Sequence, residues 1–272
     1  MIRFLCVLFF SVLCFAQPKE LGMSASEQPK ELKDVGIDEH LGQSIDTSLL
    51  VKNESGETLP LATYLNGKKP VLFSLVYFNC PGLCNFHLNG VTEALKKMDW
   101  SVGDQFDVIA LSFDSKEASE VGNKKKVSYL NLYSRAGTEK GWHFLTADEE
   151  TLKKITSTVG FKYKWDEEAK EWAHASAAIV MTPNGKIARY LHGILFEPRD
   201  MKLALIDAAE GKIASLKEKL VWFCYKYDPH TSKYSIAIFK IMQLGGGLVV
   251  FLLMIILVPF WLKSRKEKQV VS

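Results

Sequence analysis

Two continuous apolar runs stand out along the chain, both containing β-branched and aromatic residues. They read VLFSLVYF at 71–78 and FDVIALSF at 106–113. Runs of this length without alternation are typical of strands buried on both faces of a sheet. We therefore predict two central strands at these positions and a third, shorter strand at 142–145.

The segments after these strands repeat apolar residues at helical spacing. Pro81 and Gly82 open one such segment, in which Leu88, Val91 and Leu95 would share a face. A helix is therefore predicted from this point to Met98. Further helices are predicted at 117–136, 147–159 and 198–216.

A hairpin is predicted near the end of this region. The strands would be 177–182 and 186–191, joined by the turn Pro183-Asn184-Gly185. A shorter strand-turn pattern precedes the first central strand, at 49–65, and ends in a second strand or a short helix. Strands alternate with helices first, and a hairpin and a helix close the domain. This order predicts a thioredoxin-like α/β domain at 45–217.

The two ends of the chain have a different composition. Residues 1–16 combine Arg3, a short apolar run and a small residue at Ala16, which is typical of a cleaved secretory signal peptide. Residues 17–44 are polar, with few aromatics, and are expected to form an irregular arm.

Residues 244–262 read LGGGLVVFLLMIILVPFWL, without a charge. A helix of about 20 apolar residues spans a bilayer, so we predict a single C-terminal transmembrane helix. Four cations follow in 263–272, which predicts a cytoplasmic tail by the positive-inside rule. Residues 218–243 would then be a juxtamembrane segment, and the main domain would face the periplasm or its equivalent.

Overall composition adds little to this picture. The chain has 272 residues, of which 47% are hydrophobic and 24% charged, and its formal net charge is +3. No basic face or basic-aromatic stripe indicates a nucleic-acid partner.

The cysteines carry the candidate chemistry. Cys6 and Cys14 lie in the predicted signal, so the mature chain would keep Cys80, Cys84 and Cys224. Three thiols in an oxidising compartment do not make a disulfide scaffold, and they suggest one working pair and one further cysteine.

Cys80 and Cys84 form the motif C-P-G-L-C directly after the first central strand. Residues four apart on a helix share a face, so both sulfurs could hold one soft ion or bond to each other. Free amides and the dipole at a helix start stabilise thiolate, which is both the metal-binding and the redox-active form.

A third ligand is sought among the histidines. His174 is the best placed, because it precedes the hairpin and follows a loop that begins near Phe161. Two thiolates and one imidazole suit Cu(I), whereas zinc would require a fourth ligand. The other candidates are His40, His87, His143, His192 and His230.

Other interpretations of these residues stay open. Cys80 and Cys84 could form a structural disulfide or act in thiol-disulfide exchange, although thioredoxin-type enzymes have two residues between their cysteines and this chain has three. His87 is expected to be a solvated helix residue, with a fourth-ligand role as the alternative. Asp114 is expected to cap a helix, with support of the metal site as the alternative. Cys224 is expected to be a buried or interfacial residue, with a metal or redox role as the alternative.

Three stretches together resemble the SCO/SenC family of membrane-tethered copper proteins. They are YFNCPGLC at 77–84, SFD at 112–114 and HASAAIVMTPNGK at 174–186. The resemblance covers about residues 40–217 and implies a thioredoxin-like fold, copper as the bound metal, and Cys80, Cys84 and His174 as ligands.

The chain departs from the family pattern at three points. Asn85 stands where proline is often found, and Ala173 stands where an acidic residue often precedes the histidine. The family commonly has an N-terminal anchor, whereas the span predicted here is C-terminal. The segment 222–234 before that span resembles a subgroup with the same layout.

The resemblance implies a metallochaperone that delivers copper to the dinuclear copper centre of cytochrome c oxidase subunit II, a function that requires no catalytic turnover. The alternative is a thiol-disulfide oxidoreductase that reduces the target's cysteines before copper is inserted.

Overall fold

The computed structural model describes residues 34–214, residue 246 and residues 253–257. Backbone contacts divide the chain into two units, 1–214 and 215–272. Within the second unit, residues 253–257 are helical. Among the described residues, no helix is both long and apolar enough to cross a membrane. The predicted signal peptide and Cys224 lie outside the described residues, as does most of the predicted span, whose described residues are 246 and 253–257.

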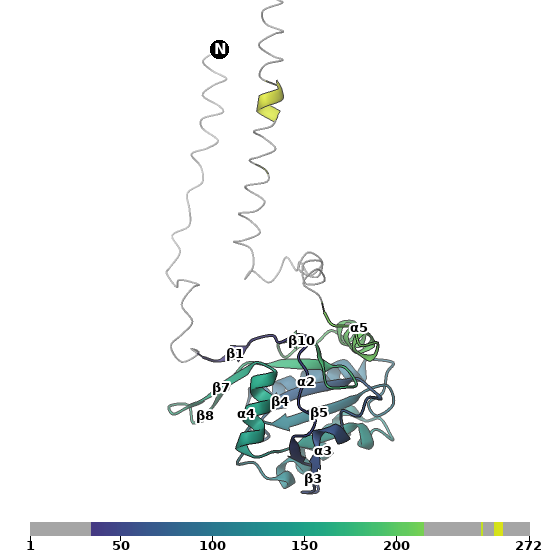
Figure 1. Ribbon diagram of the computed structural model, residues 1–272, viewed down its shortest axis with the longest axis vertical. Coiled ribbons are helices and arrows are strands. Elements are labelled where there is room, and N and C mark those ends of the chain that lie inside the picture. The colour runs from purple at the N-terminus through teal and green to yellow at the C-terminus, as the bar shows by residue number, and fades with distance from the viewer. Residues whose placement is uncertain (1–33, 215–245, 247–252, 258–272) are drawn as a thin grey trace, which may run out of the picture. The chain divides into compact units, whose positions relative to one another are not determined.

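A five-stranded sheet forms the centre of the first unit, in the order β10-β9-β4-β5-β6. Figure 1 labels β10, β4 and β5 of this sheet. Strands β4 (Val71–Val76), β5 (Asp107–Ser112) and β6 (Trp142–Leu145) are parallel to one another. Strand β9 (Ala177–Met181) is antiparallel to β4, and β10 (Ile187–His192) is antiparallel to β9. All five predicted strands are therefore confirmed, each to within two residues at either end.

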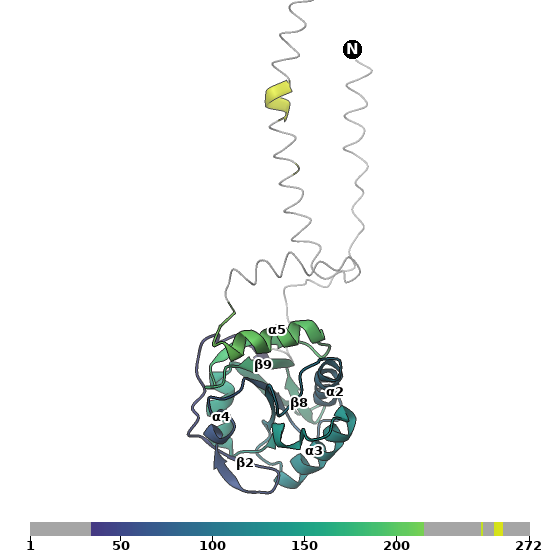
Figure 2. The same cartoon turned by 90° about the vertical axis from the view of Figure 1, so that its right-hand side faces the viewer.

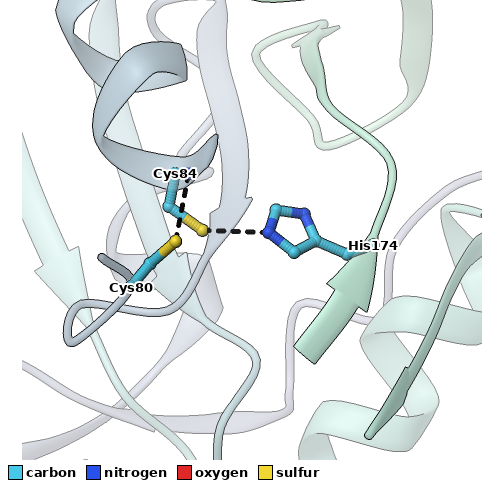
Figure 3. Close-up of side chains that lie close together, drawn as sticks. All are labelled: Cys80, Cys84 and His174. Atoms are coloured by element: carbon cyan, nitrogen blue, oxygen red, sulfur yellow. Dashed lines mark hydrogen bonds between the residues drawn. The ribbon is translucent and has the colours of Figure 1, made fainter. Parts of the chain in front are cut away.

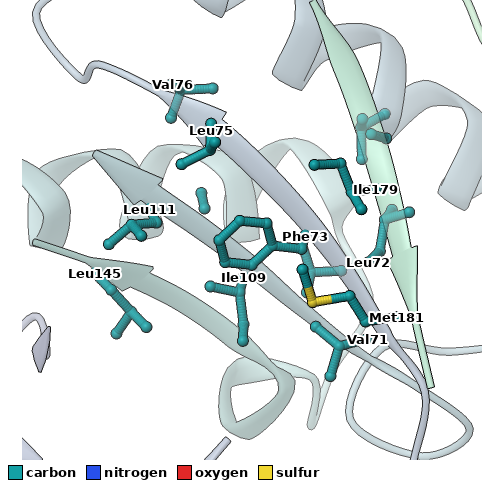
Figure 4. Close-up of a cluster of buried hydrophobic side chains, with 14 of the residues drawn as sticks. Val71, Leu72, Phe73, Leu75, Val76, Ile109, Leu111, Leu145, Ile179 and Met181 are labelled. Atoms are coloured by element: carbon teal, nitrogen blue, oxygen red, sulfur yellow. The ribbon is translucent and has the colours of Figure 1, made fainter. Parts of the chain in front are cut away.

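Strand β4 lies in the middle of this sheet, and its side chains are apolar on both faces except for that of Ser74. Every residue of β4 and of β5 is buried. The strands are in register from Val71 opposite Asp107 to Val76 opposite Ser112. Figure 4 shows the β4 side chains packed among those of β5 and β9. Burial of each large apolar side chain contributes about 1.5–3 kcal/mol, so this strand gives the site a rigid base.

The helices cover both faces of the sheet. In Figure 2, α2 (Leu83–Lys96) and α3 (Ser119–Tyr133) lie on one side of the strands, and α4 (Glu149–Thr158) lies on the other. Helix α5 (Pro198–Ala209) packs on β9 and β10. Helix α5 ends earlier than the predicted 198–216. The α/β class is confirmed, and the element order is that of a thioredoxin-like domain.

A second small sheet is a feature that the sequence interpretation missed. Strands β7 (Phe161–Asp166) and β8 (Glu171–His174) form an antiparallel hairpin, so the predicted loop from Phe161 to His174 is wrong. The alternation of Phe161, Tyr163 and Trp165 with charged residues is a strand pattern. At the turn, Asp166 Oδ1 accepts hydrogen bonds from the backbone N–H groups of residues 168 and 169.

The remaining elements are short. Strand β1 (Gly36–Ile37) pairs with β7, so this part of the arm has regular structure. Strands β2 (Leu50–Lys52) and β3 (Thr58–Pro60) form the predicted small hairpin, and the 3₁₀ helix η2 (Leu61–Thr63) follows it. A second 3₁₀ helix, η3 (Glu139–Gly141), precedes β6.

Candidate metal centre

Cys80 and Cys84 lie at the junction of β4 and α2, as predicted. Cys84 is in the first turn of the helix, and the N-cap position is Gly82, which has no side chain to accept the free amides. Cys80 Sγ takes that role, accepting hydrogen bonds from the N–H groups of Gly82 at 3.4 Å and Cys84 at 3.3 Å. The Cys84 sulfur in turn accepts from the N–H of Tyr77 at 3.3 Å. Both cysteines are free thiols and are buried.

The two sulfurs have opposite acid-base properties. The pKa of Cys80 is lowered to about 4, because the Cys84 thiol and two backbone amides donate hydrogen bonds to its thiolate. Burial raises the pKa of Cys84, because desolvation penalises a second thiolate beside the first. These opposite shifts favour a thiolate at Cys80 beside a thiol at Cys84.

His174 is the last residue of β8 and brings an imidazole to the same place (Figure 3). Its Nδ1 lies 2.8 Å from the carbonyl oxygen of Ala175, which can only accept, so Nδ1 carries the proton. The lone pair is then on Nε2, which lies 3.3 Å from Cys84 Sγ. Ala173 removes the acidic residue expected before the histidine, and the neighbouring carbonyl fixes the tautomer in its place.

Aromatic rings surround this imidazole. Phe113, Tyr77 and Phe161 have ring centroids 5.2, 6.0 and 6.1 Å from that of His174. A cleft of about 700 Å³ adjoins these rings and is lined in part by Phe113, Phe161 and Trp172. The rings limit the orientations open to the imidazole.

The three predicted ligands are brought together by the fold. The sulfur atoms of Cys80 and Cys84 and a ring nitrogen of His174 lie within 4.8 Å of one another. Two soft sulfurs and one imidazole nitrogen are a donor set suited to Cu(I). No fourth His, Cys, Asp or Glu joins this group within the described part of the chain, and zinc would need one.

Glu117 supports the cysteine loop and was not identified from the sequence. Its buried carboxylate accepts hydrogen bonds from the N–H groups of Phe78 at 2.6 Å and Asn79 at 2.7 Å. It also accepts one from the Ser112 hydroxyl at 2.6 Å. Glu117 thus joins the end of β5 to the residues that lead into Cys80.

Asn85 gives this loop a second support. Its side-chain amide donates to the carbonyl oxygen of Cys80 at 2.7 Å, and its own oxygen accepts from Lys125 at 2.6 Å. Proline could make neither bond. The departure from the family pattern at this position therefore replaces a rigid ring by a hydrogen-bonded link to helix α3.

His87 corrects the sequence interpretation. It is buried, with 2% of its surface exposed, and is not a solvated helix residue. Its ring nitrogens lie 2.9 Å from the hydroxyls of Ser74 and Ser176, so neither is directed to a metal as a fourth ligand. Its spacing, three residues after Cys84 and four before Val91, places it on the apolar face of the helix, whereas its partners Ser74 and Ser176 are distant in sequence and could not be identified there.

Burial of His87 should make stability depend on pH. Its pKa falls from 6.5 to about 4, because desolvation disfavours the imidazolium. Between those values the unfolded chain binds more protons, so the free energy of unfolding decreases as pH falls. We expect His87 to account for roughly 2–3 kcal/mol of that decrease. Urea unfolding of the metal-free protein at pH 7 and pH 4.5 measures it, and His87→Gln should lose less stability than wild type over this interval. An equal loss in the variant would contradict the prediction.

Asp114 does not cap helix α3, which begins at Ser119. Its carboxylate accepts from the Lys116 N–H at 3.0 Å and from the indole N–H of Trp172 at 3.3 Å. Trp172 precedes His174 by two residues in β8. Asp114 therefore supports the strand that carries the imidazole, which was the alternative interpretation of this residue.

The remaining histidines lie elsewhere. His40 Nδ1 contacts the carbonyl of Thr158 at 3.0 Å, and His192 Nε2 lies 2.9 Å from a Glu39 carboxylate oxygen. The ring of His143 packs on Tyr64 with centroids 4.7 Å apart. His230 lies outside the described residues.

Comparisons with known proteins find similarity in structure only. No protein-family model and no curated protein matches the sequence. Two solved structures of candidate electron transfer and electron transport proteins from Aquifex aeolicus VF5 match with TM-scores of 0.55 and 0.51. Each is 23% identical in sequence to this chain. The first match covers 63% of this chain and 95% of the Aquifex chain, and the second covers 62% and 99%.

A copper-bound structure of Arabidopsis thaliana ScoI also matches. Its TM-score is 0.49 at 13% identity, over 63% of this chain and 99% of that one. The Aquifex structures show that the described domain has a fold already known from solved proteins. The chain thus has this α/β fold, and the motifs that it carries at the β4-α2 junction and at β8-β9 resemble those of the SCO/SenC family.

Proposed function

We propose that the chain is a copper-binding member of the SCO/SenC family that serves assembly of a respiratory oxidase. One observation carries the proposal: two sulfurs and an imidazole nitrogen converge within 4.8 Å. The Nδ1–H bond to Ala175 leaves Nε2 free to bind a metal. A disulfide reductase has no need of a histidine oriented in this way.

Delivery to the dinuclear copper centre of subunit II is the step we propose for this site. Copper would pass by exchange of ligands, as acceptor thiolates or imidazoles replace Cys80, Cys84 and His174 one at a time. The signal peptide would direct export before it is cleaved, and the span at 244–262 would hold the domain at the outer face of the membrane. Tethering donor and acceptor to one surface raises their effective concentration.

Copper content tests this proposal. The full-length protein, recovered in detergent from the membrane fraction and reduced, should bind about one Cu(I) per chain by metal analysis. His174→Ala should weaken Cu(I) binding by more than about tenfold, because it removes one of three ligands. Wild-type protein without copper affinity, or binding that His174→Ala leaves unchanged, would refute the proposal. Recovery of the full-length chain in the soluble fraction would refute the tether.

Thiol-disulfide exchange is the second candidate, and the two backbone amides directed at Cys80 Sγ favour it. The Cys80 thiolate would attack a target disulfide to form a mixed disulfide, and Cys84 would then displace the target. The target disulfide takes up two electrons and leaves as two thiols, with one proton from Cys84 and one from solvent, and Cys80 and Cys84 end as a disulfide. This function predicts that His174→Ala supports oxidase assembly fully while Cys80→Ser does not.

A further inference from the structure

His87 lies one helical turn beyond Cys84, on the side of α2 that faces the sheet. It is buried under the ring of Phe196, whose centroid lies 5.4 Å away. Burying an imidazole among apolar groups is costly unless its nitrogens are hydrogen-bonded. Both nitrogens have partners here, and these partners come from different parts of the fold.

The hydrogen-bond pattern fixes the role of each nitrogen. The Ser176 hydroxyl donates to the carbonyl of Gly193 at 3.1 Å, so its oxygen accepts from His87 Nδ1–H at 2.9 Å. His87 Nε2 then accepts from the Ser74 hydroxyl at 2.9 Å. One neutral tautomer satisfies every group, as expected for a buried polar network that holds its members in one arrangement.

This network reaches the segment that carries the imidazole ligand. Ser176 belongs to the two-residue link between β8, which ends at His174, and β9. Its backbone is held as well, because Gly193 N–H donates to the Ser176 carbonyl at 2.9 Å. The position of Ser176 therefore constrains Ala175, whose carbonyl orients the His174 ring.

Two hydrogen bonds join α2 to residues 174–176 within the described structure. One is the contact of Cys84 Sγ with His174 Nε2, and the other is that of His87 with Ser176. A metal bound by Cys84 Sγ and His174 Nε2 would use the lone pairs of these two atoms, so the hydrogen bond between them would be lost. The second contact involves no ligand atom, so metal binding need not end it.

We infer that His87 is a positioning residue, which through Ser176 holds the His174 imidazole at the correct place and angle for the two sulfurs. This inference rests on the proposed function for its consequence in copper binding, but its structural content can be tested without copper. Outer hydrogen-bond partners of metal ligands typically affect metal affinity by about 10–100-fold.

The test compares four variants of the full-length, reduced protein in detergent. Ser176→Ala removes the bridging hydroxyl with little change in volume, and His87→Gln removes one of the two ring contacts. Ser176→Thr keeps the hydroxyl. Thr92→Val is the matched control, because Thr92 is buried on the same helix and its hydroxyl bonds only to the carbonyl of Leu88 at 2.7 Å.

Two measurements decide the outcome. Nitrogen-15 shifts of the His174 ring in metal-free protein should show one Nδ1–H tautomer in wild type, Ser176→Thr and Thr92→Val, and a mixture in Ser176→Ala and His87→Gln. Competition with a Cu(I) chelator should show affinity lowered about tenfold in the latter two alone. A wild-type tautomer and wild-type affinity in Ser176→Ala would overturn the inference. If wild type binds no copper, the proposed function fails, and the tautomer measurement alone decides the role of His87.

Discussion

Replacing Cys84 by serine should abolish stoichiometric Cu(I) binding by the full-length protein. Cys84 is the central donor, with its sulfur 3.3 Å from His174 Nε2 and within 4.8 Å of Cys80 Sγ. A serine hydroxyl is a hard, neutral oxygen and is a poor ligand for a soft ion. We expect affinity to fall by more than the roughly 100-fold that loss of an outer partner can cost. Chelator competition and metal analysis of the reduced protein measure it.

The same substitution at Cys224 is the matched control. Cys224 is the third cysteine of the predicted mature chain and is expected to be a buried or interfacial residue without a metal role. Cys224→Ser should therefore keep about one Cu(I) per chain. Equal loss in both variants would show that copper is not held by the cysteines of the β4-α2 junction alone, and retention of copper by Cys84→Ser would contradict the site itself.

The central sheet could be predicted because burial on both faces leaves a local signature. A strand such as Val71–Val76 is apolar at every position except Ser74, and that pattern is visible without any knowledge of its neighbours. The same holds for the cysteine pair, because a strand end, Pro81 and Gly82 mark the helix start within a few residues. The proximity of His174 followed from the hairpin that comes after it and from the family resemblance.

The supports of the site could not be predicted in this way. Glu117 and His87 are polar residues in or before helices, where solvent exposure is the ordinary expectation. Their burial depends on partners such as Ser112 and Ser176, which reach them only through the folded topology. The β7-β8 hairpin was missed because its alternation is short and rich in lysine, although it brings aromatic rings to His174.

Each half of the site is held by a support that contacts no ligand sulfur or imidazole nitrogen. Glu117 fixes the residues that lead into Cys80, and His87 links α2 to the segment after His174. A soft ion released by ligand exchange needs donors that stay in place while one of them is replaced. Supports of this kind keep the remaining donors preorganised.

Glu117→Gln should therefore destabilise the domain and loosen the cysteine loop together. The substitution preserves volume, but it replaces one of the two carboxylate oxygens by an amide group that donates hydrogen bonds. In one orientation the amide would face the N–H of Asn79, and in the other it would face the N–H of Phe78 and the Ser112 hydroxyl, all of which are donors. Losing charge-assisted bonds in a buried position should cost about 3 kcal/mol. For a domain of this size that corresponds to a melting temperature lower by about 6–12 °C. Cu(I) affinity should fall as well, because Cys80 follows the released residues.

Glu120→Gln provides the control, since Glu120 is an exposed carboxylate in the first turn of α3. Its loss should cost less than about 1 kcal/mol, through a weaker interaction with the helix dipole, and should leave copper affinity unchanged. Thermal unfolding and chelator competition on the same samples separate the two effects. If Glu117→Gln has the same melting temperature as wild type, the carboxylate does not hold the loop. If the variant has a lower melting temperature but wild-type copper affinity, the hydrogen bonds of Glu117 stabilise the fold without shaping the site.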